Sequence, residues 1–206
     1  MSYHAKDVAD FLLQGLTKGL AMRGRAVLVV SGGSSPVPIF EQLTQMDFAW
    51  DNTIITLVDE RDVPASHPDS NHRLVQETLL QGKAAKATFI PLHDNAAAQD
   101  QIGQADSLLL GMGMDGHFAS LFPAMIGQEE AFDVSATPQI IKTAPMGSPI
   151  HPRISMNMAL IATIPHKCLI LPNEEKAAFY NAAIQDETKP VYYLHRDLGD
   201  SLTLFA

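Results

Sequence analysis

Two patterns of hydrophobic residues recur along the chain: apolar positions at helical spacing, and short continuous apolar runs. Residues 5–23 place apolar side chains, among them Val8, Leu12 and Leu16, at helical spacing, which predicts an amphipathic helix. The next segment, AVLVV at 26–30, is a continuous apolar run typical of a strand buried on both faces. Because predicted helices alternate with predicted strands along the chain, the sequence predicts a three-layer α/β fold, with a mostly parallel sheet and helices on both faces.

The remaining segments extend this alternation to the end of the chain. Strands are expected at 53–58, 86–92, 107–111, 140–144, 167–172, 191–195 and, as an edge strand, 202–206. Helices are expected at 36–43, 70–80 and 173–185, whereas 153–164 is interpreted as a strand running into a helix and 95–106 as a helix or a loop. No repeat or linker divides the chain, so residues 1–206 are expected to form one domain.

Composition and charge narrow the class of partner. A hydrophobic content of 46% and a charged content of 18% fit a globular chain, and the net charge of -9 argues against nucleic acid or an anionic membrane. The sequence contains neither a membrane-length apolar run nor a signal-peptide pattern at its start. The lone Cys168 is expected to be a buried strand residue, since it cannot form an internal disulfide. We therefore expect a cytoplasmic protein.

Four unusual stretches each follow an apolar strand. They are residues 31–36, 59–64, 111–117 and 173–176. Ligands of open parallel sheets bind outside the carboxyl ends of the strands. This shared placement predicts that the four stretches contribute to one site.

The first stretch, SGGSSP, is a glycine-hydroxyl loop between a strand and a helix. Gly32, Gly33 and Ser34 would allow backbone N–H groups to approach an anion such as phosphate, which the helix N-terminus also favours. The loop lacks the Gly-Lys-Ser/Thr ending of a Walker motif. An ordinary tight turn is the alternative.

Five further charged residues are candidates for holding a ligand. Asp59 and Arg61 come directly after a strand, where a guanidinium can bind phosphate or carboxylate with two hydrogen bonds, although a surface salt-bridge network is the alternative. Arg73 is either part of the same pocket or a solvated helix residue. Lys176 lies in the first turn of a helix, where the helix dipole disfavours a cation, and Arg153 alone carries little information.

The third stretch, GMGMDGH, places Asp115 and His117 on a glycine-rich loop. Histidine titrates near neutral pH, so His117 is a candidate general base, with Asp115 orienting it or contacting a sugar hydroxyl. The spacing of Gly111, Gly113 and Gly116 also fits a dinucleotide fingerprint, but no acidic strand end follows about 20 residues later. No histidine pair has metal-ligand spacing and the chain has one cysteine, so no metal site is expected.

Taken together, these motifs resemble the 6-phosphogluconolactonase family. The matching segments are SGGSSP at 31, DERDVP at 59, SNHR at 70, LGMGMDGHFASLFP at 110, PRIS at 152 and EKA at 175. The resemblance implies a fold of the sugar-phosphate isomerase and deaminase type. It implies hydrolysis of 6-phospho-D-glucono-1,5-lactone to 6-phosphogluconate in the pentose phosphate pathway, with no cofactor. The expected partner is the phosphorylated lactone, and the chain is expected to be a monomer or a homodimer.

The resemblance also extends to the roles of single residues. His117 would take a proton from water and return it to the departing ring oxygen, with Asp115 positioning it. The glycine loop, Arg61, Arg153 and Lys176 would hold the phosphate or the developing negative charge. Two positions depart from the family pattern: Phe118 replaces the usual threonine, and Asn173 replaces a glycine.

Two other functions remain open at this point. Glucosamine-6-phosphate deaminases carry a glutamate five residues after the histidine, and this chain has Phe122 there, which cannot transfer a proton. A non-catalytic sugar-phosphate binder would keep the pocket without turnover. The segment between Pro91 and Leu108, which is short for the family, supports that second alternative.

Overall fold

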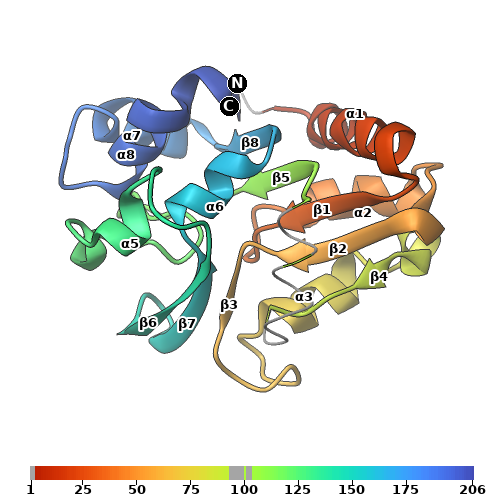
Figure 1. The fold of residues 1–206 in the computed structure, drawn as a ribbon, viewed down its shortest axis with the longest axis horizontal. Helices are drawn as coiled ribbons and strands as arrows, with labels where there is room; N and C mark the ends of the chain where they lie inside the picture. The colour runs from red at the N-terminus through yellow and green to blue at the C-terminus, as the bar shows by residue number, and fades with distance from the viewer. Residues whose placement is uncertain (1–2, 93–99, 101–103) are drawn as a thin grey trace.

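The computed structural model describes residues 3–92, 100 and 104–206. Within these residues, six strands form one sheet in the order β4–β2–β1–β5–β8–β9, and every neighbouring pair is parallel (Figure 1). The strands are β1 (Ala26–Val30), β2 (Thr53–Leu57), β4 (Thr88–Phe89), β5 (Ser107–Leu110), β8 (His166–Ile170) and β9 (Leu202–Phe205). The predicted α/β class and the edge strand at the C-terminal end are confirmed. Most of the ambiguous segment 95–106 lies outside the described residues.

Both faces of the central strands are covered. Every residue of β1 and β5 is buried, although successive side chains of a strand point to opposite faces. The α-helices whose bounds fall within the described residues are α1 (Ala5–Arg23), α2 (Val37–Gln45), α3 (Asn71–Thr78), α5 (Glu129–Phe132), α6 (Met158–Thr163), α7 (Glu174–Ala183) and α8 (Pro190–Leu198). The 3-10 helices are η1 (Trp50–Asn52), η2 (Gly82–Lys86), η3 (Pro123–Met125) and η4 (Gly199–Ser201).

A second, antiparallel sheet lies beside the first and was not expected. It has the order β3–β7–β6, with β3 (Asp59–Arg61), β7 (His151–Met156) and β6 (Ile140–Met146). The chain leaves β2 and enters β3 after one residue, so the charged stretch 59–64 begins with a short strand. In its register, Arg61 is paired with Arg153. The second sheet therefore brings together two arginines far apart in the sequence.

The prediction of a strand at 191–195 is wrong. These residues belong to α8, in which Val191, Leu194 and Leu198 are buried at helical spacing. Aromatic and β-branched residues suggested a strand, but Pro190 at the first helical position favours a helix start. The ambiguous segment 153–164 does run from a strand into a helix, β7 into α6, with the side chain of Asn157 accepting a hydrogen bond from Leu160 N–H.

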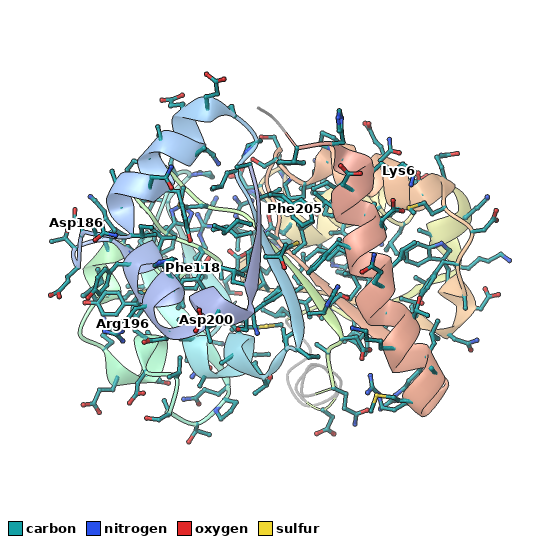
Figure 2. All side chains as sticks on the ribbon, turned by 90° about the horizontal axis from the view of Figure 1, so that it is seen from above. Lys6, Phe118, Asp186, Arg196, Asp200 and Phe205 are labelled. Carbon is teal, nitrogen blue, oxygen red and sulfur yellow. The ribbon has the colours of Figure 1, made fainter. Side chains whose placement is uncertain are left out.

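The core encloses several residues singled out in the sequence. Cys168 in β8 is fully buried, and desolvation raises the pKa of its thiol. Phe118 is also fully buried and packs edge-on against Phe132, with ring centroids 6.4 Å apart, whereas charged side chains such as Lys6 and Asp186 lie at the rim (Figure 2). Among the described residues, no helix combines the length and apolar character that a membrane crossing requires.

Candidate active site

The four polar stretches line one cavity at the carboxyl ends of the parallel strands. Its volume is about 230 Å³. This is slightly below the about 300–1,000 Å³ typical of drug-sized ligand sites and suits a small molecule. The predicted residues in its lining are Gly32, Gly33, Ser34, Asp59, Arg61, His117, Arg153 and Lys176. The site therefore combines three cations with a glycine loop and a histidine.

The glycine loop is shaped by close contact with α3. A Cβ on Gly32 would come within 1.9 Å of Asn71 Oδ1, so only glycine fits against this side chain. Gly33 has φ of +82°, in the left-handed region that glycine tolerates. Asn71 lines the cavity, and its buried Oδ1 has no hydrogen-bond partner in the protein. Sequence reasoning missed Asn71; its place within the SNHR motif was the available signal.

Arg61 and Arg153 form a pair of neighbouring guanidinium groups. Arg61 donates to the backbone oxygen of Asp69 at 2.5 Å, and Arg153, only 4% exposed, donates to the Pro149 oxygen at 2.9 Å. The Nε atom of each is buried without a partner. Burial lowers the pKa of Arg153, and the nearby charge of Arg61 lowers it further. Two adjacent cations with unused donors favour an anion between them.

The carboxylates of the DER segment have different tasks. Asp59 lines the cavity and accepts a hydrogen bond from the Ser120 hydroxyl at 2.5 Å. Glu60 is fully buried and accepts hydrogen bonds from the backbone N–H groups of Asn71 and His72 at the start of α3. Glu60 thus stabilises the helix end that carries Asn71, rather than facing the cavity.

Lys176 reaches the cavity from the first turn of α7. The side chain of Asn173 caps this helix by accepting a hydrogen bond from Lys176 N–H at 2.9 Å. The backbone of Asn173 is extended, with φ of -153°, so the asparagine that replaces the family's glycine adopts no left-handed conformation. The ammonium of Lys176 donates to the Met112 oxygen at 2.5 Å, and desolvation lowers its pKa. This cation therefore lies next to the glycine-rich loop of His117.

His117 is held by Asp115 from the same loop. His117 Nδ1 lies 2.5 Å from Asp115 Oδ1, and the backbone N–H of His117 donates to the same oxygen at 3.2 Å. Burial raises the pKa of Asp115, but the hydrogen bonds and charge of His117 outweigh it, so the pKa lies below its ordinary value. Asp115 is absent from the cavity lining, which His117 joins. The aspartate thus orients the histidine without facing the cavity itself.

The surroundings of His117 fix its ring position. A Cβ on Gly113 would come within 2.2 Å of the His117 ring, so a side chain there would displace the histidine. The ring of Phe122 lies 4.6 Å from that of His117, and Arg153 lies 5.7 Å from the same phenylalanine ring. The loop is held from behind by α8, because Val191 N–H donates to the Gly116 oxygen at 3.0 Å.

Arg73, predicted as a substrate-binding candidate, does not join the cavity lining. It lies on α3, and its Nε donates to Glu77 at 2.8 Å in an exposed pair one helical turn away. Such pairs contribute little to stability.

The dinucleotide alternative has no support in the backbone. A dinucleotide fingerprint opens directly into a helix, whereas Met112 forms an isolated antiparallel bridge with Phe118 across the loop. Among the residues described, one group of three side chains could hold a metal ion, namely His67, Asp69 and His151, none of which was predicted.

Comparison with known proteins places this fold and site in a family. Residues 2–202 match the model of a family described as glucosamine-6-phosphate isomerases/6-phosphogluconolactonase. A 6-phosphogluconolactonase of Neisseria meningitidis is 40% identical over 198 residues, which are 90% of this chain and 85% of that protein. One from Pseudomonas aeruginosa is 38% identical over 201 residues, which cover 90% and 83% of the two chains.

Solved structures agree with these sequence matches. The structure of a Shewanella baltica 6-phosphogluconolactonase shares 31% identity with a TM-score of 0.82, covering 98% of this chain and 91% of that chain. A monomeric glucosamine-6-phosphate deaminase, 17% identical with a TM-score of 0.68 over 98% and 90% of the two chains, shares the fold alone. The chain belongs to the family of glucosamine-6-phosphate isomerases and 6-phosphogluconolactonases and, within it, to the 6-phosphogluconolactonases.

Proposed function

We propose that this protein hydrolyses 6-phospho-D-glucono-1,5-lactone to 6-phosphogluconate, a step of the pentose phosphate pathway, with His117 as the general base. The observation that carries the proposal is that one cavity is lined by a histidine oriented by Asp115, by the glycine loop and by the adjacent Arg61 and Arg153. The curated relatives with this activity, 40% identical over 90% of the chain, support it.

The proton steps follow from the geometry of His117. Its Nδ1 donates to the carboxylate of Asp115, so the lone pair of the neutral imidazole is on Nε2. Nε2 takes a proton from a water molecule as that water attacks the lactone carbonyl carbon. When the tetrahedral intermediate collapses, the ester bond to the ring oxygen breaks and His117 returns the proton to that oxygen. Water is thus added across the ester bond, and the histidine is regenerated.

The cations provide the second part of the mechanism. Arg61 and Arg153, with the backbone N–H groups of the loop 32–34, would bind the phosphate and fix the distance of the lactone from His117. Lys176 is bound to the Met112 oxygen in the loop of His117, so its charge would stabilise the negative oxygen of the tetrahedral intermediate.

Phe122 separates this site from that of a deaminase. Its ring lies beside His117, with ring centroids 4.6 Å apart, at the position where the family pattern of deaminases has a glutamate. A phenyl ring cannot exchange protons, so His117, oriented by Asp115, is the acid-base group of this loop. This arrangement suits ester hydrolysis, which needs one base that also returns its proton.

The test follows the disappearance of freshly prepared 6-phosphogluconolactone, corrected for spontaneous hydrolysis, with and without the protein. Acceleration that is lost in His117→Asn supports the proposal. No acceleration, with 6-phosphogluconate still binding in a calorimeter, would instead establish the non-catalytic sugar-phosphate binder.

A further inference from the structure

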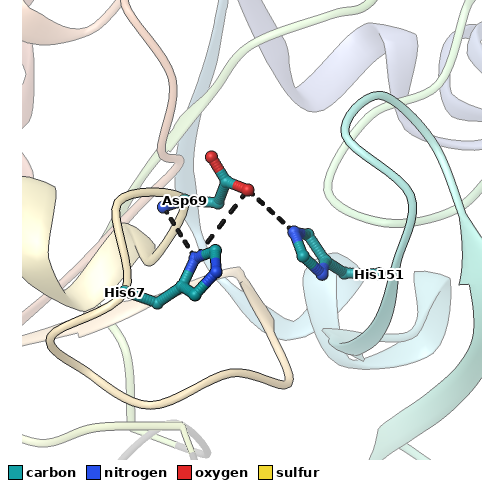
Figure 3. A group of neighbouring side chains, drawn as sticks. All are labelled: His67, Asp69 and His151. Carbon is teal, nitrogen blue, oxygen red and sulfur yellow. Dashed lines mark hydrogen bonds and ion pairs between the residues drawn. The ribbon is translucent and has the colours of Figure 1, made fainter.

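A cluster of two histidines and one aspartate lies next to Arg61, outside the set of residues that line the cavity. His67 and Asp69 belong to the segment between β3 and α3, and His151 begins β7 (Figure 3). The three ligand atoms, one from each residue, all lie within 4.8 Å of one another. The mechanism proposed above uses none of these three side chains.

The side chains converge on one carboxylate oxygen. His151 Nε2 lies 2.8 Å and His67 Nδ1 3.8 Å from Asp69 Oδ2. Dashed lines in Figure 3 join both rings to this oxygen. Tetrahedral Zn²⁺, with bonds of about 2.0–2.2 Å to nitrogen and oxygen, holds its ligand atoms roughly 3.4 Å apart. The two distances lie on either side of this value, and the two imidazole nitrogens lie within 4.8 Å of each other, so rotations of the side chains could place all three ligand atoms around one ion.

The protonation of the cluster is also compatible with metal binding. The backbone N–H of Asp69 donates to His67 Nδ1 at 3.1 Å, so that nitrogen carries a lone pair, and a bound ion would replace this hydrogen bond. His151 Nε2 is hydrogen-bonded to Asp69 Oδ2 at 2.8 Å, so an imidazole nitrogen and the carboxylate already face each other. The nearest cation, Arg61, is bound to the backbone oxygen of Asp69 and leaves its carboxylate available.

We propose that His67, Asp69 and His151 bind one late first-row divalent transition ion, represented by Zn²⁺. Two imidazoles with one carboxylate are ligands typical of zinc and its neighbours, whereas Mg²⁺ prefers sites of oxygen alone. The side chains are 20–38% exposed, so water completes the coordination. The bound ion links the segment before α3 to the start of β7 and thereby stiffens the side of the cavity that carries Arg61.

The experiment titrates the purified, metal-stripped full-length protein with ZnCl₂ in a calorimeter, in a buffer that does not chelate metals and without substrate. We expect saturable binding of one ion. At a hundredfold excess over Kd, the Tm should rise by about 5 °C or more. A parallel titration with MgCl₂ should show no comparable binding. Equal affinity for both ions would contradict nitrogen ligation.

Matched variants assign the binding to this cluster. His67→Asn, Asp69→Asn and His151→Asn should each weaken Zn²⁺ binding by at least about tenfold, the loss that even changes outside the ligand shell produce. Asp69→Asn keeps an oxygen that can accept from His151, so it removes the charge while preserving the local structure. The thermal unfolding of each metal-free variant checks that it has folded.

Two further variants separate this site from other histidines. His4→Gln changes a histidine at the start of α1, and His117→Asn changes the one in the cavity; both should bind Zn²⁺ like the wild type. The proposal is overturned if the cluster variants bind Zn²⁺ as tightly as the wild type. Loss of binding in His117→Asn alone would also overturn it. Because no substrate is present, failure here leaves the lactonase proposal untouched.

Discussion

Two histidine–aspartate pairs in this protein have similar local chemistry but different origins. His117 and Asp115 are two residues apart on one loop, and His151 and Asp69 are 82 residues apart on two segments. In both pairs a ring nitrogen lies within 2.8 Å of a carboxylate oxygen, and both aspartates have lowered pKa values. Only the first pair contributes its histidine to the cavity lining.

The difference shows that a histidine–carboxylate contact alone does not define a catalytic group. His117 lines a cavity together with Arg61, Arg153 and Lys176, the cavity in which we propose that the phosphorylated substrate binds. His151 instead faces a second histidine, His67, whose ring centroid lies 5.4 Å away. The neighbours of each pair therefore decide whether it is suited to proton transfer or to metal binding.

The largest effect on catalytic rate is expected from changing His117, the histidine of the first pair. His117→Asn should lower kcat by about 10²–10⁴-fold and leave KM nearly unchanged, because the general base is lost while the phosphate contacts remain. Steady-state kinetics with freshly prepared lactone measure both constants. Full activity in this variant would remove His117 from the mechanism.

A smaller effect on catalytic efficiency is expected for Arg61, which lines the cavity of His117 and donates to the backbone oxygen of Asp69. Arg61→Gln should lower kcat/KM by about 10–100-fold, mainly through KM, since a charge-assisted hydrogen bond contributes about 1.5–3 kcal/mol. Arg73→Ala is the matched control, because Arg73 pairs with Glu77 outside the cavity lining. Its kcat/KM should change by less than about twofold. The reverse order of the two variants would show that Arg73 is the phosphate ligand.

The histidine of the second pair should influence turnover only slightly. His151→Asn, assayed with a metal chelator present, should change kcat by less than about fivefold, because the His151 side chain lies outside the cavity lining and is hydrogen-bonded to Asp69. A loss of kcat as large as that of His117→Asn would mean that the two pairs share the chemistry.

The smallest effect concerns stability in acid. The pKa of Asp115 is lowered in the folded state, so its contribution is present above the ordinary pKa of about 3.9 and is lost as the pH falls through the folded-state value. Asp115 is half exposed, so this contribution is a fraction of about 1 kcal/mol. Urea unfolding between pH 6 and 2.5 should therefore show a slightly weaker pH dependence for Asp115→Asn than for the wild type.

Much of the fold was predictable because it depends on local patterns. Continuous apolar runs marked the buried strands β1 and β5, and helical spacing marked α1. The prediction failed at α8, where the composition of VYYLH favoured a strand and the burial of Val191 and Leu194 on one face determined a helix. Local propensity is weak compared with the free energy of burying such a face.

Several candidate groups of the proposed active site could be identified from short-range patterns in the amino-acid sequence. The loop of Asp115 and His117 is a short-range unit, because its glycines permit the backbone turn and its two side chains are close in the chain. Motif order and the position of Phe122 were likewise sufficient to recognise the 6-phosphogluconolactonase family.

Contacts between residues far apart in the chain could not be predicted in this way. The antiparallel pairing of β3 with β7 places Arg61 beside Arg153 and brings His151 to Asp69. Arg73 was also a candidate for binding the ligand, but its side chain pairs with Glu77. The physical reason is that strand register and the packing of helix ends are set by contacts between segments far apart in the chain. The spacing of residues within one segment therefore does not predict those contacts.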